Sequence, residues 1–133
     1  MEHGYQIALR PLSEVLQSEH VDPANVAMLR ESIVRAGHWL EPIIVECSQG
    51  IVMDGNHRYN AALQLGLKRV PCIQLDYTDP RVRVRHWQTG QAFDVARIFI
   101  TIARGEMFAY KTTRHAFDPA LPVVAIPLER LYA

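Results

Sequence analysis

A glycine turn joins an apolar, strand-like run to a helix-like run near the middle of this chain. Ile51-Val52-Met53 precedes the turn Asp54-Gly55-Asn56-His57-Arg58, and residues 59–65 have the composition of a helix. A strand, a glycine turn and a helix start bring unpaired backbone N–H groups and polar side chains to one point. Because a helix N-terminus also carries partial positive charge, this arrangement suits a phosphate.

The side chains of this turn add phosphate-binding chemistry. Arg58 can hold two phosphate oxygens in a bidentate fork, and His57 can donate to a phosphoryl oxygen. Asp54, at the end of the strand, could ligate Mg²⁺. On a purely structural interpretation, Asp54 caps the helix and Arg58 pairs with a surface acid. The turn by itself leaves both interpretations open.

A second polar cluster lies near the end of the chain, at Lys111-Thr112-Thr113-Arg114-His115. In an extended segment, side chains alternate between the two sides of the backbone. Lys111, Thr113 and His115 would then share one side, and Thr112 and Arg114 the other. One side could bind an anionic or zwitterionic small molecule. A solvated basic loop is the alternative interpretation.

Two isolated residues could join these clusters. A lone Trp usually lies in the core, but Trp87 follows a strand-like run and lies just before Thr89-Gly90, so it could line a pocket. Glu19 lies in a polar run, and by itself it has the character of a surface carboxylate. The other histidines and the two cysteines show no metal-ligand spacing.

Length and composition indicate one domain over residues 1–133, with a turn at 76–80 that could divide it into 1–78 and 79–133. Apolar content of 49% and charged content of 21% are ordinary for a soluble protein. The net charge of zero gives no electrostatic argument for a nucleic-acid partner. With no bilayer-length apolar run and no secretory segment, we expect a cytoplasmic protein without a membrane partner. The oligomeric state is open.

Hydrophobic periodicity predicts an α+β fold, in which helices pack on a small mixed β-sheet. Predicted helices run from the capping pair Asp22-Pro23 to Gly37, from Asn56 to Gly66 and from Gln91 to Arg104. The predicted strands are 5–9, 42–46, 51–53, 70–75 and 81–85. In the last of these, valines alternate with arginines, which predicts a half-buried strand with a basic face.

Together these pieces resemble the ParB/sulfiredoxin-like superfamily from about residue 9 to residue 77. The shared features are a helix ending in Gly, Pro-Ile-Ile-Val, a hairpin, Asp-Gly-x-His-Arg, a helix, Leu-Gly-Leu, and Val-Pro before a strand. Sulfiredoxins carry a catalytic cysteine where this chain has Asn56, which argues against reduction of cysteine sulfinic acid. ParB proteins carry Gly-Glu-Arg-Arg and a DNA-binding helix-turn-helix, and the short remainder of this chain argues against DNA clamping.

Within that superfamily the chain resembles most the free L-serine kinases, which form O-phosphoserine. Their pattern includes an early Glu, Asp-Gly-His-His-Arg, a Trp after the central strand, and a late Gly-x-x-Phe-x-x-Lys-Thr-Thr-Arg-His. The late motif is present here from Gly105 to His115. The chain carries both the Asp54–Arg58 motif and the late motif in the order that the serine kinases have. This favours a binding role for residues 111–115 over the interpretation as a solvated loop. In two respects the chain departs from the pattern, since Asn56 replaces the first His and the chain is shorter.

The resemblance implies a role for each residue that matches a motif. Glu19 would accept the proton of the serine hydroxyl or orient that hydroxyl, and Asp54 would lie beside the transferring phosphoryl group and the metal. The implied nucleotide-binding residues are Gly55, Asn56, His57 and Arg58. The implied substrate-binding residues are Trp87, Lys111, Thr113, Arg114 and His115.

We therefore expect a kinase that transfers a phosphoryl group from ATP or ADP, with Mg²⁺, to the hydroxyl of free L-serine or a related small hydroxy amino acid. A nucleotide-binding regulatory ParB-like module without catalysis is the alternative, and a DNA-associated ParB-like protein is a third hypothesis. The sequence does not choose between ATP and ADP, nor does it fix the acceptor.

Overall fold

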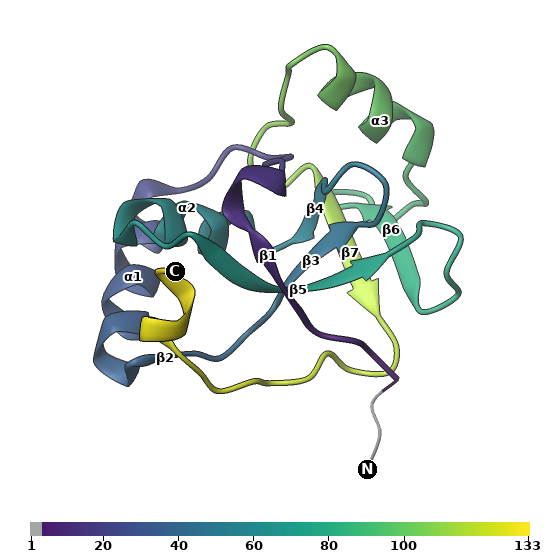
Figure 1. The fold of residues 1–133 in the computed structure, drawn as a ribbon. Helices are drawn as coiled ribbons and strands as arrows, with labels where there is room; N and C mark the ends of the chain where they lie inside the picture. The colour runs from purple at the N-terminus through teal and green to yellow at the C-terminus, as the bar shows by residue number, and fades with distance from the viewer. Residues whose placement is uncertain (1–3) are drawn as a thin grey trace.

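A four-stranded mixed sheet forms the centre of the computed structural model, which describes residues 4–133 (Figure 1). Its strand order is β1 (Ala8–Pro11), β5 (Arg69–Leu75), β3 (Ile43–Glu46) and β4 (Val52–Asp54). The central pair β3–β5 is parallel, and the two outer pairs are antiparallel. The predicted α+β class is confirmed.

Both faces of this sheet are covered. Helices α1 (Pro23–Ala36) and α2 (Asn56–Leu65) lie over the face that carries Ile43 and Val45, where the largest buried cluster forms. On the opposite face, Ile44 packs with residues of the hairpin formed by β6 (Val82–His86) and β7 (Thr113–Phe117). A strand buried on both faces needs a continuous apolar run, which explains Ile-Ile-Val in β3.

The first helix begins and ends at the predicted residues. Asp22 accepts a hydrogen bond from the Ala24 N–H at 3.0 Å, and Pro23 takes the first helical position. Gly37 adopts a left-handed conformation with φ 71°, and its N–H donates to the Ile33 and Val34 carbonyls. Both ends are set by residues adjacent to the helix, so local sequence was sufficient to predict them.

The remaining elements connect distant parts of the chain. Helix α3 (Val95–Ala103) stands apart from α1 and α2, at the top of Figure 1, and packs through a third cluster that includes Phe93 and Phe108. The C-terminal segment returns to α1, where β8 (Ile126–Pro127) pairs with β2 (His38–Trp39). Two short 3₁₀ helices complete the fold at Leu12–Glu14 and Leu128–Leu131. The expected division at residue 78 stays a prediction.

Two predicted starts were wrong by three residues or more, while the other predicted helix and strand ends lie within two residues of those in the structure. The first strand begins at Ala8 and not at Tyr5, whose ring packs in the cluster under β6. Helix α3 begins at Val95 and not at Gln91, because Asp94 caps it and the Arg85–Ala92 bridge keeps the preceding residues extended. The valine–arginine alternation of β6 is confirmed, with Val82 buried and Arg83 and Arg85 exposed. Within residues 4–133, no helix has the length and apolar character needed to cross a membrane.

Candidate active site

The start of helix α2 has no side-chain cap among the described residues. Gly55 precedes the helix with φ 118°, and a Cβ there would lie 3.2 Å from two side-chain carbons of Ile43. The first helical hydrogen bond runs from the Tyr59 N–H to the Gly55 carbonyl at 2.8 Å, so the N–H groups of residues 56–58 have no intrahelical acceptor. The glycine is therefore required by its conformation and by its close approach to β3.

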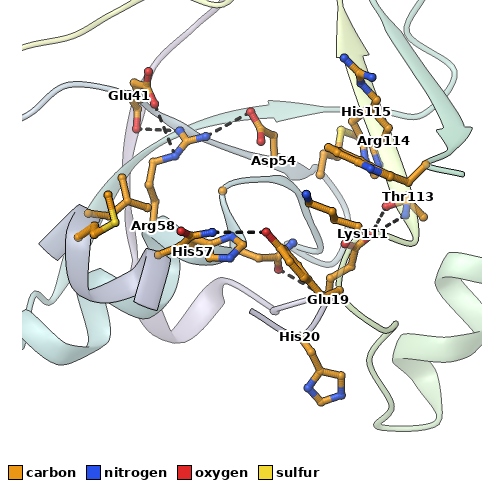
Figure 2. Close-up of a pocket in the computed structure, with 18 of the residues that line it drawn as sticks. Glu19, His20, Glu41, Asp54, His57, Arg58, Lys111, Thr113, Arg114 and His115 are labelled. Carbon is orange, nitrogen blue, oxygen red and sulfur yellow. Dashed lines mark hydrogen bonds and ion pairs between the residues drawn. The ribbon is translucent and has the colours of Figure 1, made fainter. Parts of the chain in front are cut away.

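Arg58 is held at the edge of this site by the strand ends around it. Its Nη1 donates to the Pro42 carbonyl at 2.6 Å and the Glu41 carbonyl at 3.2 Å, and its Nη2 pairs with Asp54 Oδ2 at 3.2 Å (Figure 2). The Glu41 carboxylate lies 3.8 Å from Nε. Asp54 therefore pairs with Arg58 and does not cap the helix. The guanidinium is fixed before any ligand arrives.

His57 has its protonation state set by the backbone. Its Nε2 lies 3.1 Å from the Asp22 N–H, which donates to it. An acceptor nitrogen carries no proton, so the neutral ring keeps its proton on Nδ1 as a donor. Burial lowers the pKa of His57 below its ordinary value, against the opposing effect of Asp22 and Glu19. The ring also meets the Tyr110 ring edge-on, with centroids 5.5 Å apart.

Asn56 directs its side chain away from the position expected for a phosphate. Its Oδ1 accepts from the Ser18 N–H at 2.9 Å and from the Glu19 N–H at 3.5 Å, and its Nδ2 donates to Ser18 Oγ at 3.2 Å. The backbone N–H of Asn56 lies in the first turn of α2 and has no intrahelical acceptor. The nucleotide contact predicted for Asn56 would therefore be made by its backbone N–H group, while its side chain binds residues 18 and 19.

Glu19 is a buried carboxylate, not the surface residue that its local sequence indicates. It is 8% exposed, and its Oε2 accepts hydrogen bonds from the Thr113 N–H at 2.8 Å and from the Thr113 hydroxyl. In the described part of the chain, no hydrogen bond reaches its Oε1, while Glu19 lines the main cavity. Thr113, expected to bind substrate, therefore holds this carboxylate in place.

Two cations flank the exposed ring of Trp87. Lys111 Nζ and Arg114 Cζ each lie 5.3 Å from the ring centroid, and Trp87 as a whole residue is 41% exposed. The predicted alternation fails at Lys111, which precedes β7 with a left-handed φ of 60°. Both cations therefore reach the same cavity, although alternation placed them on opposite sides.

His115 closes the far end of the site. Its Nε2 shares a 2.8 Å hydrogen bond with the Tyr77 hydroxyl. Burial lowers the pKa of His115 to about 4, and burial together with Glu46 and Glu19 raises the pKa of Tyr77. His115 is therefore a neutral polar group near neutral pH.

The predicted residues line one cavity of about 710 Å³. This volume lies within the usual range for a ligand site. Figure 2 shows Glu41, Asp54 and Arg58 on one side of it and Glu19, Lys111 and Thr113 on the other. Every predicted site residue lines it: Glu19, Asp54, Gly55, Asn56, His57, Arg58, Trp87, Lys111, Thr113, Arg114 and His115.

Sequence reasoning missed the wall contributed by helix α1 and the Tyr110 ring. The α1 residues recur at helical spacing, and one of them is a methionine with 68% exposure. In the sequence, the signal that could have marked this wall is a methionine outside the apolar stripe Val26, Leu29 and Ile33. The α1 members of the wall are Asn25, Met28, Leu29 and Ser32.

The donor set fits a magnesium ion only together with a phosphate ligand. Within residues 4–133, no group of three or more His, Cys, Asp or Glu side chains is arranged to hold a metal. Asp54 supplies one carboxylate whose side chain is 45% exposed at the cavity. Mg²⁺ commonly takes one or two carboxylates and completes its shell with phosphates and water, which Asp54 permits.

Sequence comparison decides the family. Residues 5–91 match the ParB N-terminal domain. The chain belongs to the ParB N-terminal domain family. It is 35% identical over 100 residues to a ParB-like protein of Sulfolobus acidocaldarius, covering 74% of this chain and 47% of that protein. It is 38% identical over 80 residues to an ATP-dependent L-serine kinase of Staphylothermus marinus, covering 57% of this chain and 32% of that protein.

The chain therefore spans less than half the length of these curated relatives. Among solved structures, a free serine kinase in complex with AMP superposes with a TM-score of 0.83, covering 96% of this chain and 93% of that one. The sequence identity is 16%, so this similarity shows the fold. The expected ParB-like fold is confirmed.

Proposed function

We propose that this protein is a small-molecule kinase that transfers a phosphoryl group from ATP or ADP to the hydroxyl of free L-serine or a related small hydroxy amino acid. One observation carries the proposal: a buried carboxylate, Glu19, faces the same cavity as the uncapped N-terminus of α2. A phosphate bound at the helix start and a hydroxyl bound near Glu19 would meet inside that cavity. The relatives named as L-serine kinases support this choice of acceptor.

The nucleotide phosphates would bind at the α2 start. The N–H groups of residues 56–58 and the Nδ1–H of His57 would donate to phosphate oxygens, and Arg58 would neutralise charge that develops during transfer. Asp54 would hold a Mg²⁺ ion that the nucleotide brings, and this ion would supply further neutralisation of phosphate charge. The α1 wall would contact the nucleoside.

The acceptor would bind between Trp87 and Glu19. Lys111 and Arg114 would pair with its carboxylate, and the face of the indole would cover its carbon atoms. Glu19 Oε1 would take the hydroxyl proton while the acceptor oxygen bonds to the terminal phosphorus and the bridging P–O bond of the nucleotide breaks. Thr113 would keep Oε2 in place during this step.

Phosphorus NMR tests the proposal directly. The protein is incubated with Mg²⁺, with ATP or ADP, and with serine, homoserine or threonine in turn. We expect a phosphomonoester signal with at least one acceptor and none when the acceptor is omitted. If the protein binds nucleotide and yet forms no product with any acceptor, the kinase proposal is wrong. A nucleotide-binding regulatory module without catalysis would then be favoured.

A further inference from the structure

The segment that carries Glu19 has no regular secondary structure of its own. Residues 15–22 contain only isolated bridges, at Leu16 with Ile51 and at Glu19 with Phe108. Backbone bonds to Phe108 fix one side, since the Phe108 N–H donates to the Ser18 carbonyl and the His20 N–H to the Phe108 carbonyl, each at 2.9 Å. The Ser18 and Glu19 N–H groups point the other way, toward α2.

Asn56 satisfies both of these N–H groups. One primary amide offers an acceptor oxygen and a donor nitrogen side by side, and Asn56 uses both against Ser18 and Glu19. The Ser18 hydroxyl donates in turn to the Val52 carbonyl at 2.7 Å, so it accepts from Asn56 Nδ2. Every one of these groups is part of a connected network around a buried serine.

Two neighbours on α2 extend the same contact along the segment. His57 Nε2 accepts from the Asp22 N–H at 3.1 Å. Asn60 Nδ2 donates to Gln17 Oε1 at 3.0 Å, and Gln17 Nε2 donates to the Glu19 carbonyl at 2.8 Å. Side chains from the first turns of α2 thus bind residues 17–22 along their length.

We propose that Asn56 is a positioning residue for Glu19, an inference that rests on the proposed kinase function. The first turn of α2, which would hold the donor phosphates, also fixes the backbone of Glu19, the proposed base. The phosphates and Glu19 are therefore positioned by the same helix. A displacement of about 1 Å at a reacting group can cost roughly a hundredfold in rate.

The kinetic test is a double-mutant cycle of Asn56→Ala with Glu19→Gln. We expect Asn56→Ala to lower kcat by roughly ten- to a hundredfold and to change the dissociation constant of ADP by no more than about threefold. In the Glu19→Gln background, Asn56→Ala should add no more than about a twofold loss, because the positioned group is already disabled. Gln64→Ala, an exposed change on α2, is the matched control.

Amide hydrogen exchange gives a readout that needs no turnover. In Asn56→Ala, the Ser18 N–H should exchange at least about tenfold faster, while the His20 N–H, bonded to Phe108, keeps its wild-type rate. Asn56→Asp retains an acceptor oxygen and should restore most of the Ser18 protection.

Three outcomes would overturn the positioning role: an ADP affinity that falls as much as kcat, losses that multiply in the double variant, or equal acceleration of Ser18 and His20 exchange. A wild-type protein that forms no phosphorylated product overturns the kinase proposal instead. In that case the exchange rates still decide whether Asn56 holds the Glu19 segment.

Discussion

The two halves of the cavity differ in how the chain builds them. The half proposed to bind phosphate, the phosphate half, consists of five consecutive residues that run from the end of β4 through Gly55 into the first turn of α2. Its geometry follows from a glycine turn and a helix start. The half proposed to bind the acceptor, the acceptor half, combines Glu19, Trp87 and residues 111–115, which come from three distant segments. The first is a local property of the sequence, whereas the second exists only when the chain has folded. Substitutions should therefore separate the two halves.

The largest expected effect is the loss of the Glu19 carboxylate. Glu19→Ala should lower the rate of phosphoryl transfer by roughly a hundred- to ten-thousandfold, because a serine hydroxyl needs a base to accept its proton. Nucleotide affinity should stay near the wild-type value, since Glu19 belongs to the acceptor half. Steady-state kinetics and calorimetry with ADP measure the two quantities. Glu19→Gln, which can still accept from Thr113, is the control for misfolding, and equal turnover in either variant would contradict the assignment.

Lowering the pH should destabilise the fold mainly through His115, which belongs to the acceptor half. The folded state favours neutral His115, with a pKa of about 4 against the ordinary value of 6.5. The unfolded chain therefore takes up a proton first as pH falls, so stability that is full above pH 6.5 is lost progressively down to about pH 4. The loss should be up to about 3 kcal/mol.

Urea unfolding between pH 4 and 7 measures this acid effect. His115→Asn should flatten the pH dependence more than His57→Asn does, although the pKa of His57 is also lowered by burial. A steeper contribution from His57 would place the acid-sensitive group in the phosphate half instead.

Gly55→Ala should damage the phosphate half. The backbone has φ 118° there, and the new Cβ would press against Ile43 at 3.2 Å. We expect a loss of about 2 kcal/mol in the free energy of unfolding, combined with weaker ADP binding. Gly66→Ala is a matched control, because Gly66 also has a left-handed φ of 72° but an added Cβ would meet no atom of another described segment within 4 Å. If the free energy of unfolding falls equally in both variants, the contact with Ile43 in β3 does not contribute to the loss.

The smallest effect should come from the exposed ring of Trp87. Trp87→Ala removes a surface flanked by two cations, each interaction being worth about 0.5–1 kcal/mol at an exposed site. We expect a KM for the acceptor that rises by about tenfold or less, with little change in the KM for the nucleotide. Kinetics with each substrate varied in turn check this. A rise confined to the nucleotide KM would move Trp87 into the phosphate half.

Local chemistry explains which parts of the fold were predictable. The ends of α1 follow from Asp22, Pro23 and Gly37, and the turn before α2 follows from Gly55, so both were predicted from neighbouring residues. The start of α3 was wrong because a bridge to β6 holds Ala92 extended, which no local pattern reveals. The short pair β2–β8 joins residues 38–39 to residues 126–127 and was also missed.

The sequence by itself determined the turn at the centre of the phosphate half, because the glycine, the helix start and the polar side chains are neighbours along the backbone. It also marked residues 111–115 as a polar cluster. The tertiary structure alone decided that Thr113 holds Glu19, that Asn56 fixes the segment carrying it, and that α1 walls the cavity. Each of these contacts joins residues far apart in the chain. Tertiary packing determines which of these residues meet, and the spacing of residues along the sequence does not predict it.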